Sequence, residues 1–341
     1  MRYLTLFIVL ILTPMAAKAL EIEDRRWFGP DAAGTTLRVL STADTSVFAP
    51  VIDAYLEEAQ NVAIDYIVAS SGDVMAAIET SDERFDMVIS SAMNLQTKLA
   101  NDGYALPHVT SVTDVMPDWA VWRGALFAFT REPAAMVISP QAFADIGLPK
   151  TRQDLMALMR QYPERFRGRI GTYDIRASGL GFLFATQDAR TSETYWRLTE
   201  IMGFLDTQLY CCSSDMIDDV ANGELAVAYN VLGSYAQARE DTHKFEIIYP
   251  QDFTTVMLRT ALIPRNSSSP AEAGKFLDHL LSIAWRGKEI EGYEFDRPSL
   301  ESTDQTASYR HIRLGPGLLV HLDKFKKDSF LRAWENSVLQ N

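Results

Sequence analysis

The sequence has little cysteine, an excess of acidic over basic charge, and no long apolar segment. Only two of its 341 residues are cysteines, and 45 acidic against 32 basic residues give a formal net charge of −13. Such a charge disfavours nucleic acid or an anionic membrane surface as a partner. The apolar stretch over residues 3–12 is shorter than the roughly 20 residues that a membrane-spanning helix needs. We therefore expect a mature chain without a membrane span.

Catalytic signatures are also missing. The chain has no Gly-x-Ser-x-Gly elbow, no His-Glu-x-x-His zinc helix and no phosphate-binding Walker loop. Its five histidines are scattered without the spacing of metal ligands. We expect neither an enzyme nor a protein with a resident cofactor or metal.

The N-terminus has the three parts of a secretory signal peptide. Arg2 supplies positive charge, residues 3–12 form an apolar core, and Ala17-Lys18-Ala19 is a small-x-small cleavage pattern. We expect residues 1–19 to be removed after Ala19 and the mature protein to reach the periplasm. No cysteine lies at the cleavage point, which disfavours a lipid anchor.

The two cysteines, Cys211 and Cys212, are adjacent. One interpretation is a pair of buried thiols, because free cysteine is often buried. The other is a vicinal disulfide, which an oxidising compartment permits and which could shape a ligand loop. The sequence leaves both interpretations open.

Strand and helix patterns alternate along the first part of the chain. Strands are predicted over 36–40, 63–68 and 85–89, and helices over 47–59, 73–79 and 95–101, after an irregular surface leader at 21–35. This alternation indicates an α/β fold with a parallel sheet. The mature chain exceeds the size of one core, so we expect two lobes. Lobe one would comprise 36–130 and 252–341, lobe two 131–251, with a ligand cleft between them.

Hydroxyl side chains follow several predicted strands, at the sheet edge where α/β proteins bind ligands. Backbone N–H groups and hydroxyls at helix starts bind phosphate or carboxylate, and an arginine can clamp either with two hydrogen bonds. Serine is equally an ordinary helix N-cap. Asp44 and Asp73 would repel an anion unless they are turned away. The candidate ligand-binding residues in these loops are Ser41, Thr42, Ser70, Ser71, Gly72, Ser90, Ser91, Arg176, Ser178, Gly179 and Ser213.

Several motifs occur in an order that resembles the periplasmic solute-binding proteins of the ferric-ion type, a branch that includes binders of phosphorylated small molecules. The motifs are Ser70-Ser71-Gly72, the strand at 223–230, and residues 249–252, 261–264 and 269–282. The resemblance covers 36–285 and implies a two-lobed type II periplasmic binding fold. It also adds Tyr229 and Asn230 to the candidate ligand-binding residues.

Two departures from the ferric binders bear on the ligand. Those proteins carry a tyrosine pair shortly after the asparagine that matches Asn230, whereas only Tyr235 follows here, and the loop 41–46 lacks histidine and glutamate. The resemblance therefore implies a small organic anion, phosphorylated or carboxylated, delivered by a monomeric protein to an ABC permease. The alternatives are a sensory adaptor for a membrane histidine kinase and a ferric-ion binder.

Overall fold

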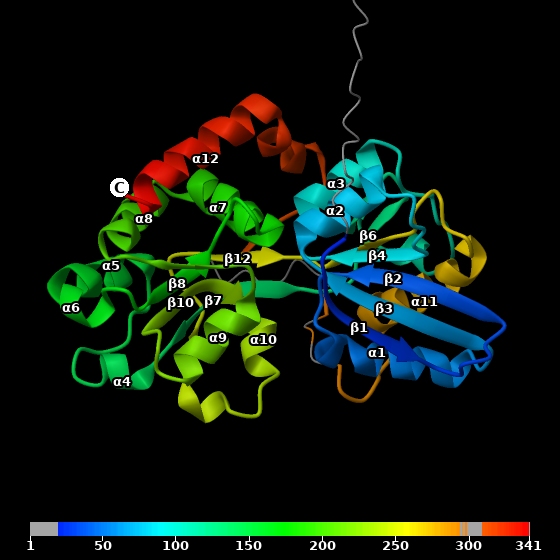
Figure 1. The fold of residues 1–341 in the computed structure, drawn as a ribbon, viewed down its shortest axis with the longest axis horizontal. Helices are drawn as coiled ribbons and strands as arrows, with labels where there is room; N and C mark the ends of the chain where they lie inside the picture. Colours follow the sequence, from blue (N-terminus) through cyan, green and yellow to red (C-terminus); the bar gives the residue numbers. More distant parts are fainter. Residues whose placement is uncertain (1–19, 294, 296, 299–308, 341) are drawn as a thin grey trace, which may run out of the picture.

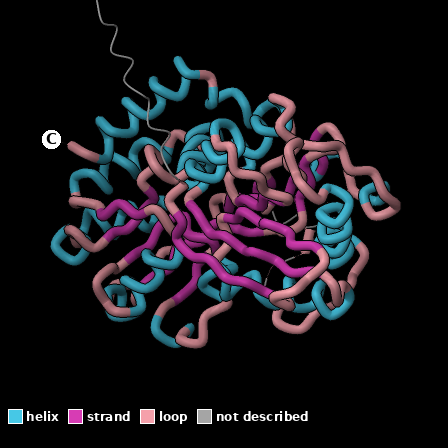
Figure 2. The backbone as a smooth tube through the Cα atoms, turned by 45° about the vertical axis from the view of Figure 1, so that its right-hand side comes forward, coloured by secondary structure: helices cyan, strands magenta, loops and turns pink. Residues whose placement is uncertain are grey.

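The computed structural model describes residues 20–340 apart from 294, 296 and 299–308. The predicted signal peptide, residues 1–19, lies outside the described residues. No helix in the described part of the chain is long and apolar enough to span a membrane. The chain folds into two lobes, each built on one sheet with helices packed around it (Figures 1 and 2).

The sheet of lobe one is mainly parallel at its centre. β2 pairs in parallel with β3 and β4, and β13 joins β4 to β6 in antiparallel pairing. β3 is buried along its whole length, as expected for a central strand covered on both faces. The strand order is β1 (Ile22–Phe28), β3 (Val62–Ala69), β2 (Thr35–Ser41), β4 (Met87–Ser90), β13 (Thr260–Leu262), β6 (Leu126–Ala128) and β5 (Val121–Trp122). Its helices are α1 (Thr45–Glu58), α2 (Ser71–Thr80), α3 (Met93–Asn101) and α11 (Pro270–Trp285), with 3-10 turns η1 (Thr113–Val115) and η2 (Asp118–Ala120).

Part of the leader predicted over 21–35 as irregular is in fact a strand. β1 runs antiparallel along β3 from Ile22 to Phe28. Arg25 forms an ion pair with Asp65 of β3, with 2.8 Å between Arg25 Nε and Asp65 Oδ1. β1 is an exposed edge strand that carries several charged residues. It therefore lacks the alternation of apolar and polar residues that identifies a half-buried strand, and this is why the prediction was wrong.

Lobe two has a mixed sheet. β10 pairs in parallel with β8 and antiparallel with β7, and β12 continues the sheet beyond β7. The strand order is β14 (Tyr309–His311), β12 (Thr254–Met257), β7 (Glu132–Ile138), β10 (Val227–Leu232), β8 (Ile170–Tyr173) and β9 (Gln208–Tyr210), with β11 (Glu246–Ile248) beside β7. The helices are α4 (Pro140–Phe143), α5 (Arg152–Gln161), α6 (Pro163–Phe166), α7 (Gly179–Thr191), α8 (Thr194–Phe204), α9 (Ser213–Ala221), α10 (Gly233–Gln237) and α12 (Lys324–Val338), with the 3-10 turn η3 (Thr242–Lys244). The 3-10 turn η4 (Pro316–Leu322) contacts α3 of lobe one and leads into α12.

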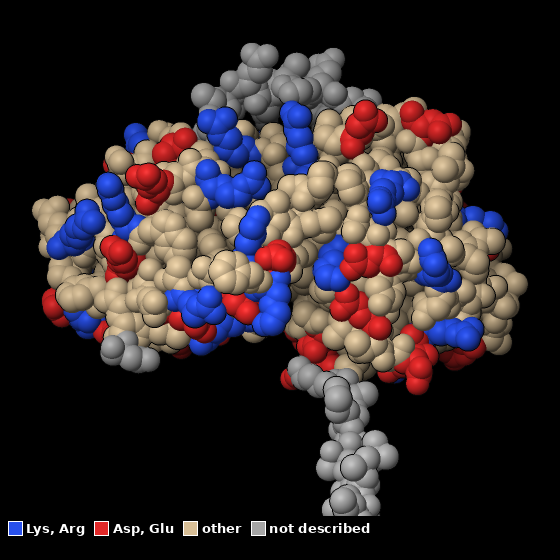
Figure 3. Space-filling view, turned by 90° about the horizontal axis from the view of Figure 1, so that it is seen from above, with Lys and Arg blue, Asp and Glu red and all other residues tan. Residues whose placement is uncertain are grey.

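The lobe boundaries differ from those predicted. Residues 252–341 were assigned to lobe one, but β12 and β14 belong to the sheet of lobe two. The C-terminal helix α12 packs against α8, and the ring centroids of Phe330 on α12 and Phe182 on α7 lie 5.7 Å apart. α12 lies over lobe two in Figure 1, and the face that carries it shows basic and acidic side chains interspersed (Figure 3).

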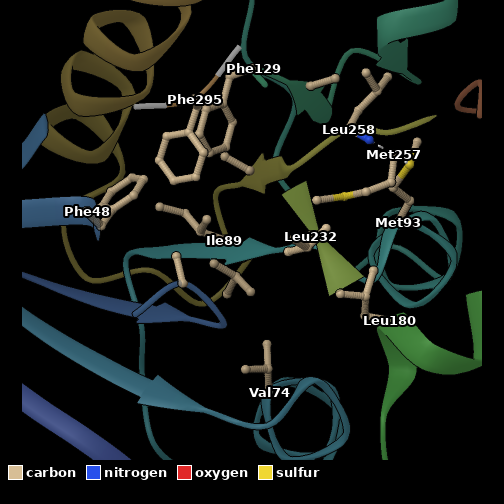
Figure 4. Packing of buried hydrophobic residues seen from close by; sticks show 14 of the residues in the cluster. Phe48, Val74, Ile89, Met93, Phe129, Leu180, Leu232, Met257, Leu258 and Phe295 are labelled. Carbon is tan, nitrogen blue, oxygen red and sulfur yellow. Dashed lines mark hydrogen bonds between the residues drawn. The ribbon is translucent and has the colours of Figure 1, made fainter. Parts of the chain in front are cut away.

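The two lobes share one apolar cluster and one buried ion pair at their junction. Leu180 and Leu232 of lobe two lie beside Met93 and Met257 in this cluster (Figure 4).

Next to the cluster, Arg259 Nε and Nη2 each donate a 3.0 Å hydrogen bond to the carboxylate of Glu132, and both side chains are fully buried. Glu132 is the first residue of β7, and Arg259 lies between β12 and β13. The ion pair therefore joins the two chain segments that pass from one lobe to the other.

Candidate functional site

A cavity of about 850 Å³ lies between the lobes. Lobe one contributes the ends of β2, β3 and β4 and the start of β1, and lobe two contributes the segments that precede α7, α9 and α10. On the lobe-one side the lining residues are Glu21, Glu23, Thr42, Asp44, Ala69, Ser70, Ser71, Gly72, Asp73, Ala76 and Ser91. On the lobe-two side they are Tyr173, Ala177, Ser178, Leu180, Cys211, Cys212, Ser213, Ser214, Asp215, Leu232 and Tyr235.

Many of the hydroxyl residues predicted from the sequence line this cavity. They are Thr42, Ser70, Ser71, Ser91, Ser178 and Ser213, and the predicted Gly72 lies beside them. Some are also helix caps: Ser70 Oγ accepts from the Asp73 N–H at 3.1 Å, and Ser178 Oγ accepts from the Gly181 N–H at 3.1 Å. Ser70 and Ser178 therefore both cap a helix and line the cavity.

Three predicted residues lie behind the wall. Ser41 Oγ accepts hydrogen bonds from Tyr66 Oη and from the Ala43 N–H, and Ser90 Oγ accepts from the Ala92 N–H. The Gly179 N–H donates to Ser71 Oγ at 2.8 Å. These residues shape the loops of the cavity from behind.

The structure does not place the Arg176 side chain in the cavity wall. Its guanidinium makes two hydrogen bonds to Asp174, Nε to Oδ1 at 2.8 Å and Nη2 to Oδ2 at 2.6 Å. Because the acid two residues earlier holds the arginine at the exposed surface, we do not retain Arg176 as a ligand clamp.

Tyr229 and Asn230 also lie away from the cavity, in a buried polar network of lobe two. Tyr229 Oη accepts a 2.6 Å hydrogen bond from Arg152 Nε and donates to Asp188 Oδ2 at 3.0 Å, and Asn230 Nδ2 donates to the same oxygen at 2.8 Å. Buried charges need partners of this kind. These two residues satisfy Asp188 and Arg152 inside lobe two, which corrects their assignment as ligand contacts.

The cavity lining is acidic. Five carboxylates line it, and no Lys, Arg or His occurs among its described lining residues; the five are Glu21, Glu23, Asp44, Asp73 and Asp215. Asp44 is turned inward, where its Oδ2 accepts a hydrogen bond from Ser214 Oγ. Desolvation and the negative charges of Asp44 and Asp215 raise the pKa of Glu23. Desolvation, followed by Asp218 and Asp44, raises the pKa of Asp215. Among the described lining residues, the wall of the cavity thus carries acidic and no basic side chains.

Cys211 and Cys212 form a disulfide in this wall, with their Cα atoms 3.8 Å apart. They connect β9 to α9, and Cys211 is exposed. Of the two interpretations open from the sequence, the vicinal disulfide is the one in the structure, and the pair of buried thiols is not.

Direct hydrogen bonds cross the cleft from one lobe to the other. Ser214 Oγ donates to Asp44 Oδ2 at 2.7 Å, and the Asp44 N–H donates to Tyr235 Oη at 3.3 Å. The Gly179–Ser71 bond is a third crossing. The lobes are therefore in contact on both sides of the cavity, as in a closed binding protein.

Part of the cavity wall was not predicted from the sequence. Glu21 and Glu23 lie in the segment that was predicted to be irregular. The charged residues before Trp27-Phe28 were the sequence signal that could have indicated an edge strand. Tyr173 and Tyr235 carried no motif of their own, because a tyrosine that ends a strand or begins a short helix looks like core.

A model of the bacterial extracellular solute-binding proteins matches residues 41–286. A solved substrate-binding protein of an ABC transporter from Agrobacterium tumefaciens is 30% identical, with a TM-score of 0.83 over 92% of this chain and 98% of that one. The periplasmic binding protein AfuA from Actinobacillus pleuropneumoniae, solved with exogenous fructose-6-phosphate, is 15% identical, with a TM-score of 0.68 over 90% and 99%. Iron-bound HitA from Pseudomonas aeruginosa is 16% identical, with a TM-score of 0.64 over 89% and 99%. No curated protein matches by sequence.

These likenesses agree with the two sheets and the cavity between them, which make up a type II periplasmic binding fold. The matched proteins bind solutes and are not enzymes. The chain belongs to the bacterial extracellular solute-binding protein family.

Proposed function

We propose that this protein is exported by its 1–19 signal peptide, binds a small organic cation in the interlobe cavity, and delivers it to an ABC permease. The observation that carries the ligand class is the acidic lining, with five carboxylates and no basic side chain among the described lining residues. Burial and mutual repulsion raise the pKa values of Glu23 and Asp215. A bound cation would relieve that repulsion.

An organic cation fits better than a bare metal ion. Fe(III) requires several anionic oxygens around one point. Among the described residues, only Cys211, Cys212 and Asp215 bring three ligand atoms of His, Cys, Asp or Glu within 4.8 Å of one another. The remaining carboxylates of the wall are spread around a cavity of about 850 Å³, within the range of small-molecule sites.

Two tyrosines supply further chemistry for a cation. Tyr173 and Tyr235 both line the cavity, and aromatic rings attract ammonium and guanidinium groups. Tyr235 also accepts from the Asp44 N–H, so the same residue links lobe closure to the ligand wall. Binding would stabilise the closed arrangement that a membrane partner recognises.

The organic anion expected from the sequence is the second candidate. It is favoured by the starts of α2, α7 and α9 at the cavity, because helix N-termini and hydroxyls bind phosphate and carboxylate groups. An anion would meet the five carboxylates without a lining arginine or lysine, and this is why we place it second.

Delivery to a permease is preferred over sensing because the 30% identical relative is the substrate-binding protein of an ABC transporter. A two-component signal-transduction protein shares the fold at 17% identity, which leaves a sensory adaptor as the alternative role.

The ligand class can be tested with residues 20–341 by thermal shift and calorimetry. The probes are putrescine, choline and arginine against fructose-6-phosphate, citrate and ferric citrate. A ligand that binds only the folded state raises the melting temperature. We expect the cations alone to do so, and Asp44→Asn to weaken their binding while Asp328→Asn, a change on exposed α12, does not. Stabilisation by the anions and not by the cations would contradict the proposal.

A further inference from the structure

The segment from Cys211 to Asp215 gathers three potential metal ligands at the start of α9. Cys211 Sγ lies 3.6 Å from Asp215 Oδ2, and one ligand atom from each of Cys211, Cys212 and Asp215 lies within 4.8 Å of the others. Cys212 is the N-cap residue of α9 and Asp215 is its third helical residue. A side chain at that position reaches back towards the cap, so helix geometry holds the carboxylate over the sulfur atoms.

We propose that reduction of the Cys211–Cys212 disulfide converts this segment into a binding site for a thiophilic divalent cation such as Zn²⁺ or Cd²⁺. The reductant is a dithiol. One of its thiolates attacks a sulfur of the pair to form a mixed disulfide, and its second thiol displaces the protein sulfur. The dithiol leaves as a disulfide, and the protein gains two electrons and two protons. Metal binding then releases the two thiol protons.

The distances suit such an ion. With Zn–S bonds of about 2.3 Å and a tetrahedral angle, two thiolates on one zinc ion lie about 3.8 Å apart. The disulfide shows that the backbone brings both sulfur atoms together, so after reduction they only have to move apart to reach this separation. Three protein ligands leave a fourth position open. All three residues line the cavity.

The surroundings favour positive charge at this point. Asp44, Asp218 and Asp219 all act on Asp215 with negative charge. Thiolate sulfur distinguishes the site from the remaining carboxylates of the cavity, because soft ligands select zinc-like ions over magnesium or calcium. The site does not depend on the organic cation proposed above, although a bound metal would occupy Asp215 and compete with that cation.

The test uses residues 20–341 purified with the disulfide intact. One portion is reduced with dithiothreitol, desalted under nitrogen and titrated with Cd²⁺ while the ultraviolet thiolate-to-metal charge-transfer band is recorded. A thiol assay counts free cysteines before and after reduction. We expect no free thiols and no band before reduction, and two free thiols and one Cd²⁺ per chain afterwards.

Substitutions test which residues bind the Cd²⁺ ion. Cys211→Ser with Cys212→Ser should abolish the band, and Asp215→Asn should weaken Cd²⁺ binding by at least about tenfold. Asp145→Asn, whose exposed carboxylate pairs with Arg165 away from the cavity lining, should leave binding unchanged. The apo melting temperature of each variant shows that it is folded. The proposal is overturned by a reduced protein with two free thiols and no band, by a band in the oxidised protein, or by undiminished affinity in Asp215→Asn.

Discussion

Ser214 of lobe two donates a 2.7 Å hydrogen bond to Oδ2 of Asp44 in lobe one. The bond connects the two lobes directly. Because its acceptor is a carboxylate, it is stronger than a hydrogen bond between neutral groups. Asp44 also donates its backbone N–H to Tyr235 of lobe two. One residue of lobe one thus makes two of the contacts that hold the cleft shut, and it also lines the cavity.

Replacing Ser214 by alanine should open the protein. A hydrogen bond to a charged group contributes about 1.5–3 kcal/mol, so the affinity for a ligand that needs the closed form should fall roughly ten- to a hundredfold. Calorimetry measures the affinity, and small-angle scattering measures the larger radius of gyration of an open form.

The matched control for Ser214→Ala is Ser267→Ala. Ser267 Oγ donates a 2.7 Å bond to Asp86 within lobe one, so its loss should lower the melting temperature and leave ligand affinity intact. Equal effects of the two variants on affinity would contradict a role for Ser214 in closure.

Gly179→Ala should also hinder closure. A Cβ atom at this position would lie 2.6 Å from Ser71 Oγ and 2.8 Å from Leu95 Cδ1 of the opposite lobe. Such contacts are too close, so Ser71 and Leu95 must move away from α7. We expect this to hinder closure and to lower ligand affinity, whereas the apo melting temperature should change little. Gly317→Ala is the control, because nothing lies within 4 Å of the Cβ it would add. Wild-type affinity in Gly179→Ala would show that the lobes do not approach this closely.

Glu132→Gln should destabilise the whole protein. It leaves the fully buried Arg259 guanidinium without its anionic partner, and breaking a buried pair in this way costs about 3–5 kcal/mol. Denaturant unfolding monitored by fluorescence measures the loss. Asp145→Asn removes the partner of the exposed Arg165 and should leave the unfolding midpoint unchanged. A midpoint for Glu132→Gln equal to wild type would mean that the junction tolerates an unpaired charge.

Ligand affinity should depend on pH in a direction that identifies the ligand. Burial and neighbouring acids raise the pKa of Glu23 above 4.5 and that of Asp215 above 3.8. Between each ordinary value and its raised value the folded protein binds more protons than the unfolded chain, so the free energy of unfolding falls as pH rises through this window. A cation should bind more tightly as pH rises through the same window and an anion less tightly. Calorimetry with putrescine across the window distinguishes them.

The sequence predicted the family fold and the hydroxyl loops because both depend on local patterns. Strand and helix alternation located β2, α1, β3, α2, β4 and α3 close to their observed bounds. Helix caps such as Ser70 and Ser178 then pointed to the cavity, since ligands and caps use the same ends of helices.

The charge of the cavity lining could not be predicted in the same way, because it depends on which side chains face one another across a cleft. Arg176 looked available in the sequence, yet Asp174 binds it. Asp44 looked like an ordinary cap, and its carboxylate faces lobe two instead. Glu23 comes into the wall through an edge strand whose partner, β3, lies about forty residues further along the chain.

The position of α12 bears on the order in which the protein can fold after synthesis. β12, β14 and α12 all complete lobe two, although about a hundred residues lie between the end of β10 and the end of the chain. Phe330 of α12 packs against the rings of Phe182, Tyr195 and Trp196. Lobe two therefore cannot reach its final packing on the ribosome or during passage through a membrane pore until the last turn of the chain has emerged. A polypeptide interrupted before residue 324 would leave those aromatic rings exposed to proteases and to aggregation.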